Sequence, residues 1–163
     1  MEQPLQVFMG YAAAFEDTYV DDDWSRLTPF FHEDARYEVR GGPMACEIEG
    51  REAIFKGLKK SIDGLDRRFD ERVIEISDGP HVTKHTDGEE VSIGWLVTYR
   101  RDGAPNIVIP GRSVFTVVDG RIAAMRDEYD DTAMTPVEAW LQQYGANLFL
   151  YVSNFPPKGI WIR

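Results

Sequence analysis

The hydrophobic residues near the start of the chain recur at helical spacing. Between residues 4 and 20, six large or apolar side chains lie three or four positions apart and form one face: Leu5, Phe8, Met9, Ala12, Phe15 and Tyr19. A second apolar stripe follows Asp23, a suitable N-cap residue, and Pro29 is expected to bend or end that short segment. From Gly50 to Leu65 the helical spacing returns, which predicts a further helix.

Alternating apolar and polar residues predict strands, most of them in the second half of the chain. The expected strands are residues 35–39, 68–76, 91–100 and the two runs on either side of Asp119-Gly120. Residues 77–90 fit either a loop or a small hairpin. Helices early and strands late in a meander favour an α+β fold, in which a curved antiparallel sheet wraps around N-terminal helices. Such a sheet leaves a concave pocket.

Asp119-Gly120 is the strongest turn signal in the sequence, because a type I′ hairpin turn needs positive φ at both central residues. With this turn, Val118 faces Arg121, and Arg112 lies directly opposite Asp127. One face then carries an apolar row that ends in this charged pair: Val114, Thr116, Ala123 and Met125. The other face carries an apolar patch through which we expect a homodimer to form: Phe115, Val117 and Ile122.

The end of the chain predicts one more helix. Thr135 as a cap, Pro136 at the first helical position and Glu138 three residues after Thr135 agree on its start, and the helix is expected to run to Leu150. The last residues, with Pro156-Pro157, are interpreted as an extension. We therefore expect one domain over 1–163, with a core at 5–132 and a C-terminal helix and extension at 133–163.

The composition suits one soluble domain with a substantial core. The chain has 163 residues, of which 43% are hydrophobic. A net charge of −10 disfavours nucleic acid and anionic lipid as partners. No apolar run is long enough for a membrane helix, no signal peptide is evident, and Cys46 is the one cysteine. These features predict a cytoplasmic protein that does not bind membranes.

Several segments resemble the NTF2-like superfamily, and within it the SnoaL-like proteins, ketosteroid isomerases and limonene-epoxide hydrolases. They are the aromatic first helix, Phe31–Tyr37, Glu49–Ile54 and Val118–Tyr129. The resemblance implies a cone-shaped NTF2-like fold, here with an extra C-terminal helix. This fold hosts isomerases, hydrolases, dehydratases, cyclases and plain binding modules, so the reaction must be argued from the site.

The resemblance implies only part of a known active site. Tyr37 and Asp127 fall on the first-strand Tyr and last-strand Asp of the limonene-epoxide hydrolases, but Val39 stands where their Asn is expected. Their Arg-x-Asp is missing from residues 91–98. The general base of the ketosteroid isomerases also falls on or near Val39, which cannot accept a proton. The pocket carboxylate of the SnoaL-like cyclases is carried over to Asp127.

Asp127, Arg112 and Tyr37 are the candidate catalytic residues. A carboxylate on an apolar wall has a raised pKa and can act as a general base. Arg112 beside it would lower that pKa, orient the carboxylate, stabilise a developing anion, or form a structural salt bridge. Tyr37 could donate a hydrogen bond to a substrate oxygen or simply belong to the core.

Aromatic residues on these elements are the candidate lining of a substrate pocket, although such residues also pack cores. With one histidine, the candidates are Tyr19, Trp24, Phe55, Trp95, Tyr129 and His32. His81 and His85 are four residues apart but have no third ligand motif, so no metal is expected. No cofactor motif is present in the sequence.

Two hypotheses follow. The first is a cofactor-independent SnoaL-like enzyme of the isomerase, cyclase or hydrolase type, which performs acid/base chemistry on a small hydrophobic metabolite. The second is a non-catalytic ligand-binding or assembly module of the same fold, which the absence of a carboxylate at Val39 favours. An open cavity beside Asp127 favours the enzyme, whereas an ion pair in a filled interior favours the module.

Overall fold

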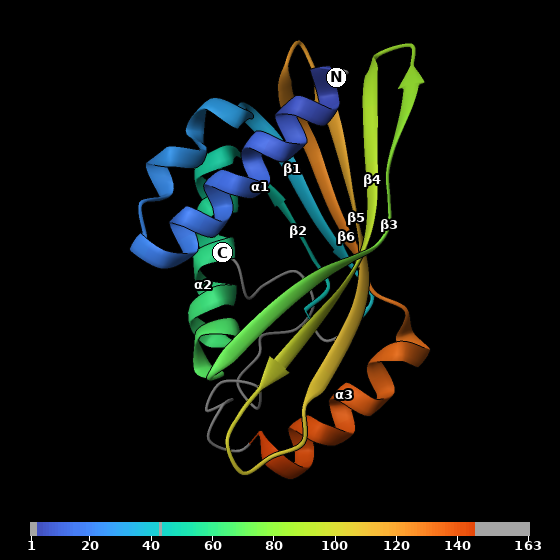
Figure 1. Cartoon of the computed structure of the whole chain (residues 1–163). Helices are drawn as coiled ribbons and strands as arrows, with labels where there is room; N and C mark the ends of the chain where they lie inside the picture. Colours follow the sequence, from blue (N-terminus) through green and yellow to red (C-terminus); the bar gives the residue numbers. More distant parts are fainter. Residues whose placement is uncertain (1–2, 43, 146–163) are drawn as a thin grey trace.

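The computed structural model describes residues 3–42 and 44–145 (Figure 1). In chain order, the elements are α1 (Gln3–Asp21), the 3-10 helix η1 (Trp24–Phe30), β1 (Phe31–Arg40), β2 (Cys46–Glu49), α2 (Arg51–Gly64), the 3-10 turn η2 (Asp66–Arg68), β3 (Glu71–His85), β4 (Gly88–Arg100), β5 (Ile107–Val118), β6 (Arg121–Glu128) and α3 (Asp131–Tyr144). The predicted α+β class is confirmed. No helix of the described ranges is long and apolar enough to cross a membrane.

The six strands form one sheet in the order β2-β1-β6-β5-β4-β3. β3 to β6 make an antiparallel meander, β1 lies parallel to β6, and β2 is antiparallel to β1. Residues 77–90, for which the sequence left a loop or a hairpin open, form the hairpin end of β3 and β4, with His85 paired to Gly88. β2 was not anticipated, because its four residues follow closely on a Gly-Gly-Pro break.

Helices α1 and α2 cover one face of the sheet. In Figure 1, α1 and α2 lie together on one side of the strands, and α3 lies at the opposite end, beside the ends of β4 and β5. Phe31 sits at the centre of this packing with no exposed surface, in edge-to-face contact with Tyr11 of α1 and Phe55 of α2. The stripe predicted for α2 is its buried face, which includes Ile54, Leu58 and Ile62. In α1 the prediction is off by part of a turn: the buried residues are Pro4, Tyr11, Ala14 and Thr18, and Met9 of the predicted stripe is 49% exposed.

The β5–β6 hairpin has the predicted turn but not the predicted register. Asp119 and Gly120 both have positive φ, and Val118 pairs with Arg121 as expected. A bulge between Thr116 and Val117 then shifts the ladder by one residue, so that Asp127 pairs with Ser113 instead of Arg112. Because side chains alternate between faces, this shift exchanges the two faces of β5 relative to β6. The predicted Arg112–Asp127 pair is wrong.

The predicted dimer surface is also wrong, because the face of β5 that carries Phe115 and Val117 is buried. Phe115, Val117 and Ile122, which were expected to form an exposed outer patch, are 4%, 4% and 0% exposed. Phe115 lies in the core against Phe8 and Tyr11 of α1. These residues therefore cannot form the surface through which a homodimer was predicted.

The last helix begins earlier than the sequence suggested. Asp130 caps α3 by accepting a hydrogen bond from the backbone N–H of Thr132, and Pro136 lies inside the helix instead of at its first position. Asp is at least as good a cap as Thr, and the chain leaves β6 at Tyr129, so the helix starts at once. Met134, Val137 and Trp140 bury one face of α3 against the sheet. The expected helical residues after Gly145, and the extension, lie outside the described residues.

Candidate functional site

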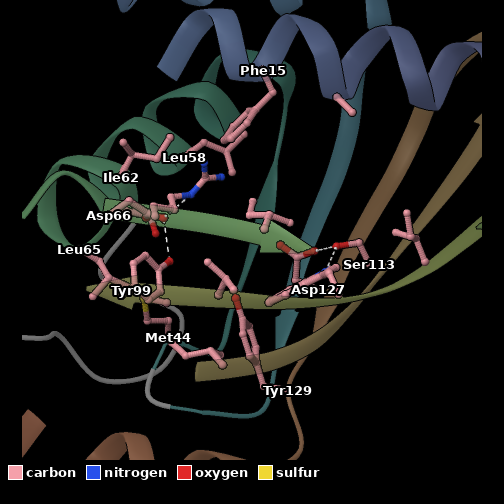
Figure 2. A pocket seen from close by; sticks show the side chains of 18 of the residues that line it. Phe15, Met44, Leu58, Ile62, Leu65, Asp66, Tyr99, Ser113, Asp127 and Tyr129 are labelled. Carbon is pink, nitrogen blue, oxygen red and sulfur yellow. Dashed lines mark hydrogen bonds and ion pairs between the residues drawn. The ribbon is translucent and has the colours of Figure 1, made fainter. Parts of the chain in front are cut away.

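A cavity of about 530 Å³ lies between the helices and the inner face of the sheet. Its walls are mostly apolar and come from α1, α2, α3 and strands β1 and β3 to β6. Figure 2 shows that polar groups gather at two separate places, one around Asp127 and Ser113 and the other around Asp66 and Tyr99, with apolar and aromatic side chains between them. We call these places the Asp127 end and the Asp66 end.

At the Asp127 end, a carboxylate is held by two hydroxyl groups. Tyr37 Oη donates to Asp127 Oδ2 at 2.6 Å, and Ser113 Oγ donates to Asp127 Oδ1 at 2.5 Å. Burial raises the pKa of Asp127 above its ordinary value, although the two hydrogen bonds act in the opposite direction. Within the described part of the chain, no cation forms an ion pair with this carboxylate. An uncompensated carboxylate of this kind is suited to accept a proton.

Trp95 extends this network across the sheet. Its indole N–H donates to Ser113 Oγ at 2.9 Å, so Ser113 is held from one side while it donates to Asp127 on the other. Trp95 also meets the ring of Tyr129 edge to face, at 5.6 Å between centroids. The indole has room against β5 because its partner there is Gly111, where a Cβ atom would lie 2.3 Å from the ring.

Replacing Gly111 by Ala is therefore expected to displace Trp95 and break its hydrogen bond to Ser113. Overpacking of this kind costs about 1–3 kcal/mol of the free energy of unfolding, which chemical denaturation would measure. The double variant Gly111→Ala/Trp95→Phe is the control, since a smaller ring relieves the clash and should restore part of the stability. Equal losses in the single and double variants would contradict this explanation.

The Asp66 end is built from an ion pair and a phenol. Tyr99 Oη donates to Asp66 Oδ1 at 2.7 Å, and Arg72 Nε lies 3.0 Å from the same oxygen. The guanidinium also contacts Glu16 of α1 at 3.3 Å and covers the ring of Tyr19, 4.8 Å from its centroid. Burial raises the pKa of Asp66, and Arg72 and Tyr99 offset part of this effect.

Besides Asp127 itself, three of the candidates chosen from the sequence lie at the Asp127 end of the cavity: Tyr37, Trp95 and Tyr129. Burial, and next the nearby Asp127, raise the pKa of Tyr37 well above its ordinary value, so its phenol stays protonated. Arg112 is not part of this group. Its guanidinium binds Asp78 of β3 at 2.6 Å and donates to Ser92 of β4 at 2.8 Å.

The remaining four candidates do not line the cavity. Phe55 belongs to the core beside Phe31, and Trp24 packs at its edge while its indole N–H donates to Asp22. Tyr19 lies under the guanidinium groups of Arg67 and Arg72. His32 Nε2 lies 2.7 Å from the carbonyl oxygen of Val118, at the turn end of the β5–β6 hairpin.

Sequence reasoning missed Ser113 and the whole Asp66 end. Ser113 could have been found only with the bulge, which places it opposite Asp127. Asp66 follows a helix and Arg72 lies near the start of a strand, so each has the pattern of a surface residue in the sequence. His81 and His85 lie on exposed β3 near Asp78 and Glu90. The described residues contain no group of three side chains arranged to hold a metal ion.

Comparisons with known proteins identify the family. A family model of the SnoaL-like domain matches residues 12–125. A comparison with curated proteins gave no significant match. Bal32a, from a soil-derived mobile gene cassette, is 26% identical, with a TM-score of 0.57, over 85% of this chain and 95% of Bal32a.

Two more distant structures have the same fold. TerC, co-crystallised with polyporic acid, is 13% identical with a TM-score of 0.60, over 86% of this chain and 99% of TerC. A protein from Jannaschia sp. CCS1, described as a SnoaL-like polyketide cyclase, is 15% identical with a TM-score of 0.54, over 81% and 91%. The predicted NTF2-like fold is thus confirmed. Because the family model covers most of the described residues, the chain belongs to the SnoaL-like domain family.

Proposed function

We propose that this protein is a cofactor-independent enzyme that moves protons on a small hydrophobic metabolite, with Asp127 as the general base. The observation that carries the proposal is the position of Asp127: a carboxylate without a cationic partner among the described residues, held in one orientation on the wall of an apolar cavity. Desolvation by such a wall favours proton uptake, and a fixed orientation favours a defined direction of transfer.

The reaction class follows from the neighbours of Asp127. A carbon acid next to a carbonyl group would lose its proton to Asp127, and the electron pair of the broken C–H bond would move to the carbonyl oxygen. Tyr129 lines the same end of the cavity, and burial raises the pKa of its phenol, so it stays protonated and can donate to that oxygen. Isomerisation and ring closure both begin with this step.

Tyr37 and Ser113 position the carboxylate in this proposal. Each donates to one oxygen of Asp127, which stabilises the ionised form and leaves further lone pairs for the substrate proton. Trp95 acts one step further away, through Ser113. These three residues thus set both the direction and the basicity of Asp127.

The test is exchange of carbon-bound hydrogen for deuterium. The protein would be incubated in D2O with a panel of aryl ketones, enones and β-keto esters, and mass spectrometry would follow deuterium uptake. The rate is expected to rise with pH through the raised pKa of Asp127, because only the ionised carboxylate accepts a proton. Ser113→Ala and Tyr37→Phe each remove a donor that lowers this pKa, so the rise should move to higher pH. A rise that stays in place in both variants would contradict the assignment.

A binding module is the second candidate, because both oxygens of Asp127 already accept hydrogen bonds from the protein. A purely structural network would have the same arrangement. This candidate predicts tight binding of compounds from the panel without any deuterium uptake, whereas the enzyme predicts both. The same experiment therefore separates the two functions.

A further inference from the structure

The Asp66 end of the cavity contains a buried ion pair. The side chain of Arg72 is 10% exposed and lines the cavity. Its Nε is buried and lies 3.0 Å from Asp66 Oδ1, so this nitrogen is paired with Asp66 and does not face a ligand. The guanidinium also contacts Glu16, which leaves the Asp66 carboxylate as the group with hydrogen-bonding capacity for a ligand.

The carboxylate of this pair is an acceptor. Asp66 already accepts from Tyr99, and a carboxylate offers about four lone-pair positions, so acceptor positions remain. A ligand group can use them only if it donates a hydrogen bond. A hydroxyl group does this, whereas an ionised carboxylate or an ether oxygen cannot donate.

The net charge of the cavity walls also favours a hydroxyl group over a carboxylate. Among the described residues that line the cavity, the charged side chains are Glu16, Asp66, Arg72 and Asp127. Three carboxylates and one guanidinium leave the walls negative, and the guanidinium is shared by Asp66 and Glu16. A ligand that brings another negative charge to this end would meet repulsion from both carboxylates.

We propose that the Asp66 end binds a hydroxyl group of the ligand, an alcohol or a phenol, and that Asp66, Arg72 and Tyr99 select this group against a carboxylate. The ligand is then an apolar molecule with a reacting group at the Asp127 end and a neutral hydroxyl group at the opposite end. This inference deepens the proposed function and depends on the same cavity. It defines the substrate class as hydroxylated and uncharged at its far end.

Three diols of increasing length test the inference, because one of them should reach both ends: 4,4′-dihydroxybiphenyl, trans-4,4′-dihydroxystilbene and 4,4″-dihydroxy-p-terphenyl. Each is compared with the matching monophenol and with the analogue in which one hydroxyl group is replaced by a carboxylate. Calorimetry gives the Kd values. For the best-fitting length, the wild-type protein should bind the diol about tenfold more tightly than the monophenol, as a hydrogen bond to a charged group implies, and the carboxylate analogue least tightly.

Asp66→Asn and Tyr99→Phe should reduce the diol advantage to the factor of about two that symmetry alone gives. Asp66→Asn should also bind the carboxylate analogue more tightly than the wild-type protein does, because Arg72 is then released to pair with it. A damaged fold would not produce a gain in affinity. Asp63→Asn, the same substitution in a surface ion pair of α2 with Lys59 and Arg67, is the matched control and should change none of the ratios.

Three results would overturn the inference. They are a diol advantage of no more than about two at every length, an advantage that survives Asp66→Asn, and a preference of the wild-type protein for the carboxylate analogue. In each of these cases the probes bind the cavity, so the proposed function is unaffected. Failure of every probe to bind would overturn the inference alone, because deuterium uptake from the carbonyl panel tests the proposed function independently.

Discussion

Asp127→Asn should lower the rate of proton transfer by roughly 10²–10⁴-fold, the range that a general base contributes. Asn has nearly the same shape as Asp, so the cavity and the apolar contacts of the substrate remain. The amide cannot take up the proton, and no other carboxylate lines the Asp127 end of the cavity within the described ranges. Deuterium uptake measures the loss, and calorimetry with the best panel compound should show a Kd within about threefold of the wild-type value.

The stability of this variant separates a lost base from a lost fold. The pKa of Asp127 is raised in the folded protein, so the contribution of this group to stability is complete at low pH and is lost as pH rises through the folded pKa. Above the folded pKa the wild-type protein carries the cost of an ionised buried carboxylate, which Asn does not have. Thermal unfolding at pH 7 should show a Tm for the variant no lower than that of the wild-type protein, and its relative advantage should shrink toward pH 4. Loss of activity together with a strongly lowered Tm would contradict the assignment.

The β5–β6 hairpin shows where local sequence signals stop being sufficient. The Asp119-Gly120 turn follows from φ preferences of the two residues themselves, and both adopt positive φ. The bulge beyond Thr116 depends on packing: Phe115 and Val117 are buried only if β5 turns that face inward. Strand pairing that is extended residue by residue from the turn cannot predict this bulge. Pairing from the turn therefore gave Asp127 the wrong partner, Arg112 instead of Ser113.

The residues at the Asp127 end of the cavity could be chosen from the sequence, whereas those at the Asp66 end could not. Asp127 and Tyr37 carried family and strand signals, and Trp95 and Tyr129 were aromatic residues on predicted strands. Asp66 and Tyr99 are 33 residues apart and touch only because β4 returns past the end of α2. Such long-range contacts leave no spacing pattern in the sequence. The same reason explains why Tyr19, Trp24 and Phe55, which were chosen for their type, proved to be packing residues outside the cavity.

Phe31→Ala should cause the largest loss of stability of any single substitution considered for this protein, about 3–5 kcal/mol of the free energy of unfolding. Phe31 has no exposed surface and joins three parts of the fold, since its ring meets Tyr11 of α1 and Phe55 of α2, each at 5.4 Å, while its backbone pairs with Ile122 of β6. Truncation removes the ring from both aromatic contacts and leaves a cavity between rigid neighbours. Urea unfolding followed by circular dichroism would measure the change.

The size of this effect depends on burial, and a matched truncation tests that cause. Val20 lies on α1 with 84% of its surface exposed, so Val20→Ala should change the free energy of unfolding by no more than about 0.5 kcal/mol. If Phe31→Ala cost as little as Val20→Ala, the helices would not be anchored to the sheet through Phe31. Phe31 of β1 packs against α1 and α2 through Tyr11 and Phe55, and both helices line the cavity. Phe31→Ala should therefore also weaken binding of the diol probes, although the ring itself does not line the cavity, because the truncation loosens the walls that hold them.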